Sequence, residues 1–325
     1  MAKLMRILSI DGGGIRGVIP AMVLAEIESL ARKPVSKLFD LIAGTSTGGI
    51  LALGLTRPGA AGKPCFTAAE MTRLYEGEGG RIFHRSNLRR IITLGHLAEE
   101  KYTADGIEGV LDQYFGESRL KDALTDVIVT SYETERRFPF FFKSRYARTR
   151  EDYDFPMKAV ARATSAAPTY FEPLKLDADA SQDYYSLIDG GVYANNPAMC
   201  GYVEAKATFP DYEDICVVSL GTGELTKPLH YEDVKRWGLV SWAQPILNIV
   251  LDGVSSTVDY QLRQLLPPAA DGFKRYWRFQ VRLSEETDAM DDARPENIRA
   301  LKLLAESLIR DRADDLKLLS EQLTK

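Results

Sequence analysis

The sequence predicts an α/β fold with a mainly parallel central sheet, and three observations carry this prediction. Residues 5–10 form a short apolar run typical of a buried strand, and the glycine-rich loop DGGGIRG follows it. From residue 18 onwards, apolar positions recur at helical spacing. Residues 39–43 then begin a second strand, loop and helix in the same order. Such alternation is typical of parallel strands joined by helices.

The remaining elements are predicted in chain order from the same signals. The second helix is expected to start at Gly49. Apolar runs bounded by glycine, proline or charge predict further strands at residues 126–131, 138–142, 184–188 and 215–220. Helical patterns lie between them, at residues 157–168 and 197–209. After Gly223 the parallel pattern is expected to end, with one more strand within residues 275–283 and an amphipathic helical tail at residues 295–323.

The chain is expected to form one main domain with an extension. Residues 1–223 hold the strand and glycine-loop pattern, and residues 224–325 are predicted to pack on the same domain as a C-terminal extension. Residues 56–114 are more polar and carry several glycines, which predicts a helical insertion or cap. No internal repeat or low-complexity linker interrupts this organisation.

Composition narrows the classes of function. The 325 residues are 45% hydrophobic and 27% charged, as expected of a globular chain, and the formal net charge is −5. Such a chain offers no overall basic field, so no nucleic-acid partner is expected. Cys65, Cys200 and Cys216 show neither a metal-site spacing nor a disulfide framework, so no metal is expected either.

Any contact with a membrane is expected to be peripheral, at the surface of the bilayer. No apolar run approaches the roughly 18 residues of a membrane span, and the first run breaks at Asp11, too early for a signal peptide. These features predict a cytoplasmic protein that meets a membrane surface transiently. The oligomeric state stays open, with a homo-oligomer as one possibility.

Two stretches are candidates for that surface. Residues 237–251 carry two tryptophans and fit an interfacial or lid helix, although a buried segment or an oligomer contact is the preferred prediction for so apolar a stretch. Residues 81–92 are rich in arginine and could meet lipid phosphates or a nucleotide activator. A solvated helix or loop face explains the arginines equally well.

The stretch GTSTGG, residues 44–49, places a hydroxyl at a strand-to-helix turn. Gly44, Ser46 and Gly48 match G-x-S-x-G, in which small neighbours let strand and helix pass closely around an exposed nucleophile. The start of the helix behind Ser46 can assist with developing negative charge. A glycine-rich turn of this kind equally suits phosphate binding, so the pattern alone leaves both interpretations open.

The loop DGGGIRG, residues 11–17, has two interpretations as well. Its unshielded amides and Arg16 could stabilise an oxyanion or hold a phosphate. The loop also matches the G-x-G-x-x-G pattern of dinucleotide sites, which expects an acidic residue about 20 positions further on. That position is Lys37, so the dinucleotide interpretation loses support. Neither glycine motif continues into the Gly-Lys-Ser/Thr of a P-loop.

A serine nucleophile needs a base, and the chain offers three histidines: His84, His96 and His230. The first two lie in the polar insertion, where surface or loop roles are expected. His230 follows Asp189 in the chain, so Ser46, Asp189 and His230 could form a triad in the order of the α/β-hydrolases. Asp189 without a histidine is the other candidate for the base, because it lies at the end of a predicted strand and is followed by a turn of two glycines. The alternative is a purely structural role for this aspartate, as a turn residue or a helix cap.

Taken in order, D-G-G-G-x-R-G, G-T-S-T-G-G, ARATSAAPTYF and D-G-G resemble the patatin-like phospholipase family, and VVSLGTG continues the match. The resemblance is to bacterial, cytosolic members of this family, which are similar to cytosolic phospholipase A-type acyl hydrolases. It implies a three-layer α/β/α fold and a Ser-Asp dyad, with Ser46 as nucleophile and Asp189 as base. Gly13 and Gly14 are then expected to donate to an oxyanion, with Arg16 assisting. The remaining motif glycines are Gly12, Gly17, Gly44, Gly48, Gly190 and Gly191.

The resemblance also implies a substrate class. Members cleave acyl esters of membrane glycerolipids through an acyl-enzyme, without a cofactor or metal, and the sequence selects neither headgroup nor acyl position. Some similar bacterial proteins are antiviral effectors switched on by cyclic nucleotides, so such an activator is a candidate partner. A triad esterase, a nucleotide-binding module and a catalytically silent lipid-binding protein are the alternatives.

Overall fold

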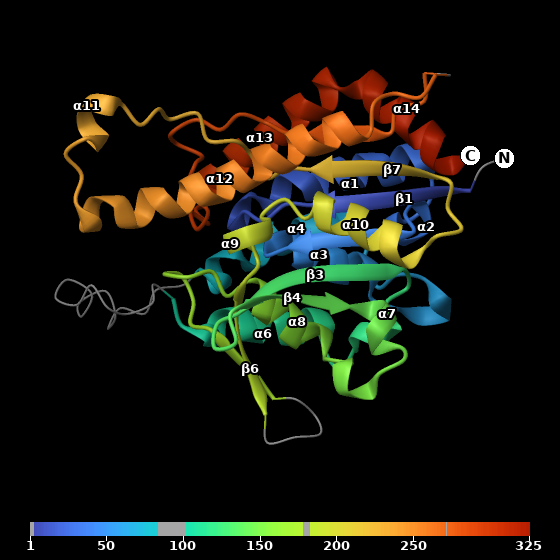
Figure 1. Ribbon diagram of the computed structural model, residues 1–325, viewed down its shortest axis with the longest axis horizontal. Coiled ribbons are helices and arrows are strands. Elements are labelled where there is room, and N and C mark those ends of the chain that lie inside the picture. The colour runs from blue at the N-terminus through green and yellow to red at the C-terminus, as the bar shows by residue number, and fades with distance from the viewer. Residues whose placement is uncertain (1–2, 84–101, 178–182, 271) are drawn as a thin grey trace.

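The computed structural model describes residues 3–83, 102–177, 183–270 and 272–325 of the chain. Within them, eight strands form one sheet in the order β5-β6-β3-β2-β1-β7-β8, with β4 beside β3 (Figure 1). The strands are β1 Leu4–Ile10, β2 Leu41–Thr45, β3 Asp126–Glu133, β4 Phe138–Lys143, β5 Leu174–Asp177, β6 Tyr184–Asp189, β7 Asp214–Leu220 and β8 Tyr276–Phe279. The neighbours from β3 through β2, β1 and β7 to β8 are parallel, and β4, β5 and β6 pair antiparallel.

Alternate residues of the central strands supply two separate cores, which makes the fold three-layered. In β1, Met5 and Ile7 belong to one buried cluster, whereas Leu8 and Ile10 belong to the other. The period of two residues in a strand sends consecutive side chains to opposite faces, so each face needs its own helical cover. The predicted α/β class with a mainly parallel sheet is confirmed.

Helices cover both faces and extend beyond the sheet. The longer ones are α1 Val18–Ala31, α3 Thr47–Thr56, α4 Ala68–Ile82, α6 Ala104–Phe115, α8 Met157–Thr164, α10 Ala198–Thr208, α12 Leu239–Leu265, α13 Pro295–Asp311 and α14 Ala313–Thr324. Short helices are α2 Val35–Leu38, α7 Ser144–Ala147, α9 Gly191–Ala194 and α11 Tyr231–Val234, with 3-10 turns η1 Gly14–Gly17, η2 Ala60–Gly62, η3 Leu120–Asp122 and η4 Glu151–Tyr153. In the described residues, no helix is both long and apolar enough to cross a membrane.

Three sequence expectations are corrected. The parallel pattern does not end after Gly223, because β8 pairs parallel to β7 and extends the sheet at that edge. Strand β5 was not predicted; its short run LKLD has little apolar character. The second helix begins at Thr47 rather than Gly49, because it starts directly behind Ser46. These errors concern short segments whose pairing depends on neighbours distant in sequence.

The predicted insertion and the C-terminal extension both pack on the main body. Helix α4 begins at a capping box formed by Thr67 and Glu70, and its residues Met71, Leu74 and Tyr75 are buried in the main core. Helices α13 and α14 pack against α1 as the expected helical extension. The division at residue 223 and the cap role of residues 56–114 stay predictions.

Candidate active site

Two neighbouring residues of β3 bring the ends of two other strands together. β2 runs along one edge of β3 as far as Thr45, which lies opposite Thr130. β6 runs antiparallel to β3 and ends at Asp189, opposite Ser131. Because β4 occupies the other edge of β3 at Ser131, β6 continues the edge that β2 leaves. Ser46, the residue after Thr45, therefore comes next to Asp189.

Ser46 lies on the sharp turn that the glycine pattern predicts. Its backbone has φ 55° and ψ −124°, a conformation that side-chain-bearing residues adopt only under strain. A Cβ on Gly44 would lie 2.4 Å from the Gly48 carbonyl oxygen, and a Cβ on Gly48 would lie 2.1 Å from the Ile10 carbonyl oxygen. The Ser46 amide donates to Thr164 Oγ1 at 2.8 Å, which holds the turn. Strand and helix pass so closely here that only glycine fits at both positions.

Asp189 is a buried carboxyl beside that hydroxyl. Its side chain is 5% exposed, and its Oδ1 accepts a hydrogen bond from the Gly191 amide at 2.7 Å. Burial raises the pKa of Asp189 to about 7, although interactions with the Ser46 side chain and the Gly191 amide both act to lower it. A carboxyl with this pKa can accept and return a proton near neutral pH.

The glycine loop after β1 is anchored at both ends. The Gly12 amide donates to the Asn195 carbonyl at 3.0 Å, and Thr222 Oγ1 donates to the Gly12 carbonyl at 2.6 Å. One turn later, the Ile15 amide donates to the Met290 carbonyl at 2.9 Å. These contacts come from distant parts of the chain, so the loop is held by tertiary structure.

Backbone amides of the loop between those anchors, together with the first amide of α3, are available to a ligand. The amides of Gly13, Gly14 and Thr47 have no hydrogen-bond partner among the described residues. All three residues line the same pocket as Ser46 and Asp189. Unpaired N–H groups beside a nucleophile are what a developing oxyanion requires. Sequence reasoning found Gly13 and Gly14 but missed Thr47, whose amide opens helix α3.

The structure places Arg16 behind this loop. Its Nε donates to the Gly13 carbonyl at 3.2 Å, and its guanidinium lines a separate polar cavity rather than the pocket with Ser46. Burial lowers the pKa of Arg16, and Asp252 on α12 opposes this shift. The placement favours a positioning role for Arg16, which holds the loop that carries the Gly13 amide, over the direct assistance expected from sequence.

Asp11, the first residue of the loop, is fixed by a buried ion pair. Its carboxylate accepts hydrogen bonds from Arg278 on β8 at 3.0 Å and 2.6 Å, and Arg278 also donates to Ser219 Oγ at 2.8 Å. Asp11 and Arg278 are almost completely enclosed, and the carboxylate holds the pKa of the Arg278 guanidinium above its usual value. The outer strand β8 is thereby tied to the glycine loop.

We expect Arg278→Met to lower the free energy of unfolding by about 3–5 kcal/mol, because it leaves the Asp11 carboxylate buried without its partner. Urea denaturation at pH 7, followed by circular dichroism, measures the loss. Arg294→Met is the matched control, since the Arg294 side chain is 77% exposed in its ion pair with Asp292. That pair should contribute less than about 1 kcal/mol. Equal losses in the two variants would contradict the anchoring role.

A mainly apolar pocket opens onto Ser46 and Asp189. Side chains from α3, α4 and α12 and from the segments that follow α4 and α8 form its wall, among them Ile50, Leu74, Phe83, Phe171, Leu247 and Leu251. A hollow with this apolar lining suits a hydrocarbon chain, and its polar groups gather at the serine.

The structure does not bring the predicted histidine to this pair. His230 is exposed at the start of α11, and it is not among the residues that line the pocket. His84, His96 and most of the arginine-rich stretch fall outside the described residues. A Cβ added at any of the other motif glycines, Gly17, Gly190 and Gly191, would lie close to atoms of the site or of the elements that support it.

Two further residues support the site without having been predicted to do so. Thr164 accepts a hydrogen bond from the Ser46 amide and donates one to the Thr130 carbonyl at 2.7 Å. Asn195 accepts from the glycine loop and donates from Nδ2 to Ser255 Oγ on α12 at 3.2 Å. Their motifs, ARATSAAP and DGGVYANNPA, signalled them only as neighbours of the candidate residues.

The described part of the chain shows no metal centre: no three histidine, cysteine, aspartate or glutamate side chains come together there as ligands would. The carboxyl at the pocket, Asp189, is engaged by Gly191 and Ser46 instead. The groups that the pocket presents beside Ser46 are its hydroxyl, this carboxyl and the free amides.

A family model described as patatin-like phospholipase matches residues 8–199, which include every candidate residue of the pocket's polar wall. The chain belongs to the patatin-like phospholipase family. Patatin-like protein 4 of Arabidopsis thaliana is 30% identical over 94% of this chain and 84% of that protein. Patatin-like protein 1 of Oryza sativa subsp. indica is 32% identical over 94% of this chain and 81% of that protein.

Two further comparisons add one curated relative and one solved structure. "Probable inactive patatin-3-Kuras 1" of Solanum tuberosum is 31% identical, over 95% of this chain and 87% of that protein. Membership in the patatin-like family therefore does not by itself establish turnover. The solved structure of VipD from Legionella pneumophila covers 94% of this chain and 67% of its own at 13% identity, with a TM-score of 0.40. The curated relatives named here are plant proteins, so the expected bacterial source stays a prediction.

Proposed function

We propose that this patatin-like protein is a serine acyl hydrolase that cleaves carboxylic esters of membrane glycerolipids with a dyad of Ser46 and Asp189. The observation that carries the proposal is the buried Asp189 carboxyl, with a pKa raised to about 7, beside the strained Ser46 turn. Both residues line one apolar pocket together with unpaired amides. A phosphate cradle needs neither such a carboxyl nor an apolar wall.

In the proposed first half-reaction, Asp189 accepts the hydroxyl proton of Ser46 while Oγ attacks the ester carbonyl carbon. The electron pair of the carbonyl moves to its oxygen, and the amides of Gly13, Gly14 and Thr47 stabilise this oxyanion. When the carbonyl re-forms, the bond to the alcohol breaks and Asp189 returns the proton to that leaving oxygen. The acyl group is now an ester of Ser46.

In the second half-reaction, water takes the place of the alcohol. Asp189 removes a proton from the water as it attacks the acyl-enzyme, and the same amides hold the second oxyanion. Collapse of that intermediate releases the fatty acid and returns the proton to Ser46. Arg16 takes no direct part, but its bond to the Gly13 carbonyl keeps the loop in position.

The apolar wall of the pocket suits a fatty acyl chain, and the lining does not select a headgroup. Activation by a cyclic nucleotide and a role in antiviral defence stay predictions. The triad alternative has less support, because His230 is exposed and away from the pocket lining. The remaining alternative is a lipid-binding protein without catalytic activity. The similarity to a relative named inactive is consistent with this alternative.

A fluorophosphonate probe should label Ser46 covalently, because only an activated hydroxyl attacks it. Ser165 is the internal control: it lines the same pocket, its hydroxyl has no partner among the described residues, and it should stay unmodified. Peptide mass spectrometry locates the label. Fatty acids released from mixed lipid vesicles, with and without cyclic nucleotides, identify the substrate. An unlabelled Ser46 together with no release under either condition would refute the proposal.

A further inference from the structure

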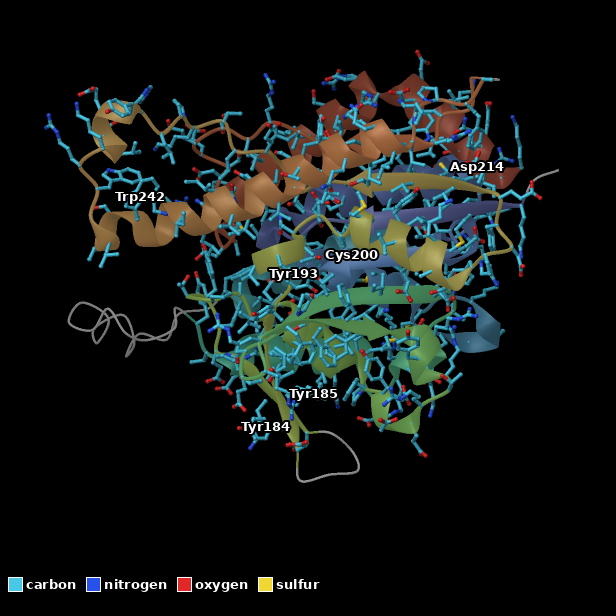
Figure 2. The ribbon with its side chains drawn as sticks, viewed as in Figure 1. Tyr184, Tyr185, Tyr193, Cys200, Asp214 and Trp242 are labelled. Atoms are coloured by element: carbon cyan, nitrogen blue, oxygen red, sulfur yellow. The ribbon has the colours of Figure 1, made fainter. Side chains whose placement is uncertain are left out.

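One end of helix α12 and the short helix before it project from the body of the protein (Figure 1). We call residues 229–250 the α12 arm. It includes α11 and the first part of α12, and Figure 2 shows Trp242 on this projecting end. For residues 237–251, a buried segment or an oligomer contact was the preferred prediction. Its exposed side chains correct the first of these.

From residue 237 onwards the exposed surface of the α12 arm is uncharged, and large apolar side chains make up much of the surface of the whole arm. Seven large apolar side chains in it are at least 36% exposed: Leu229, Tyr231, Leu239, Val240, Ile246, Ile249 and Val250. Leu239 and Val240 reach 93% and 77%. Residues 237–251 contain no charged residue at all. A helix that faces water normally carries charge on its outer face, so this surface is built for a less polar neighbour.

The inner face of the same helix belongs to the candidate active site. Leu247 and Leu251 line the pocket that holds Ser46 and Asp189. Ile246, Ile249 and Val250 are exposed directly beside them in the chain. Apolar surface therefore runs from the outside of α12 to the wall of the pocket.

We infer that the α12 arm docks this protein on the surface of a phospholipid bilayer and places the pocket against the lipid it draws from. The choice of a bilayer rests on the proposed function, because an enzyme that takes lipid esters must reach the membrane that holds them. A second protein seated on residues 246–250 would cover the apolar surface next to Leu247 and Leu251 of the pocket wall without supplying a lipid. A bilayer covers the same surface and supplies the substrate.

The side chains of the arm favour insertion of apolar groups over attraction to anionic lipid. Trp237 and Trp242 form an edge-to-face pair with ring centroids 5.1 Å apart, and indole rings prefer the boundary between headgroups and hydrocarbon. Lys235 pairs with Glu232, and Lys227 just before the arm pairs with Glu285. Within the arm, Glu232 and Asp233 balance Lys235 and Arg236, so its formal net charge is zero. Binding to vesicles of zwitterionic phosphatidylcholine alone is the expected behaviour.

Tryptophan fluorescence tests the docking directly, because two of the chain's three tryptophans lie in the α12 arm and the third, Trp277, is fully buried. In the Ser46→Ala background, which keeps the lipid intact, phosphatidylcholine vesicles should shift the emission to the blue and carry the protein upward in flotation. Leu239→Ser with Val240→Ser should reduce vesicle partitioning at least about tenfold, since each removes exposed apolar surface.

Leu303→Ser with Leu318→Ser is the matched control, because these leucines of α13 and α14 are 59% and 45% exposed away from the α12 arm. This pair should bind vesicles as the unmodified background does. In the active protein, the arm variant should lose hydrolysis of vesicle lipid but keep that of a soluble short-chain ester. Leu239 and Val240 do not line the pocket.

The outcomes separate the two proposals. If the unmodified protein binds vesicles through the arm but cleaves neither ester, the docking stands and the proposed function fails. If the arm variant floats with vesicles as well as the control does, the docking inference is overturned. It is also overturned if light scattering shows a dimer that only the arm variant loses, because a second copy then covers this surface.

Discussion

Ser46→Ala is expected to lower ester hydrolysis by about 10⁴-fold or more, because no other hydroxyl at the site lies on a strained turn beside a carboxyl. The substitution keeps Cβ and the same backbone, so the fold should persist. Steady-state kinetics with a soluble short-chain ester measure the loss, and circular dichroism checks the fold. Residual hydrolysis by the free amides would remain above the uncatalysed rate.

Two control variants sharpen this result. Ser165→Ala removes a second serine from the same pocket and should change kcat by less than about threefold, an order-of-magnitude bound for a hydroxyl outside the reaction. His230→Ala removes the third member of the alternative triad and should also leave kcat unchanged. A loss of several orders of magnitude in His230→Ala would replace the dyad by the triad.

Asp189→Asn is expected to abolish activity and to stabilise the protein at alkaline pH. Activity should fall about 10⁴-fold, the magnitude typical when a catalytic carboxylate becomes an amide. Stability should rise because burial raises the pKa of Asp189 to about 7 from 3.8, so ionising the carboxyl costs the folded state free energy. The Asp189 carboxyl ionises near pH 4 in the unfolded chain and near pH 7 in the folded protein. The wild type therefore loses stability as the pH rises between these values.

The size of the effect follows from that shift. A displacement of about three pKa units corresponds to about 4 kcal/mol at most above pH 7, and asparagine carries no such penalty. Urea denaturation of both proteins at pH 5 and pH 8 should show an advantage for Asp189→Asn that grows with pH. An advantage that stays constant with pH would mean that the carboxyl is not the source.

The same ionisation governs the wild-type reaction. Asp189 acts as a base only as the carboxylate, so kcat/KM should rise with pH up to about 7 and then level off. Below that pH the fall should approach tenfold per unit. A flat profile between pH 5 and 7 would argue against a base with this pKa.

Much of the fold follows from local patterns. The strands at residues 5–10 and 39–43, their glycine loops and the helices behind them were predicted, because apolar period and glycine placement are short-range signals. The turn at Ser46 was predicted on the same ground. The steric need for Gly44 and Gly48 arises within a few residues and does not depend on the rest of the chain.

For Arg16 and the α12 arm, local sequence patterns did not predict the surroundings of the side chains. A basic residue in a glycine loop predicts an anion in front of it, yet packing turns Arg16 to the back of the loop, toward Asp252. An uncharged stretch with two tryptophans predicts burial, yet nothing among the described residues covers its outer face. In both cases the side chain's environment comes from segments distant in sequence.

By itself, the sequence determined the α/β class, the strained serine turn and the candidacy of Asp189, because each depends on residues adjacent in the chain. Only the tertiary structure decided that Ser46 and Asp189 meet. That meeting requires β2 and β6 to end at neighbouring residues of the same edge of β3, about 140 positions apart in the chain by residue number. It also decided the raised pKa of Asp189, since burial is set by the surrounding elements rather than by the aspartate's own neighbours.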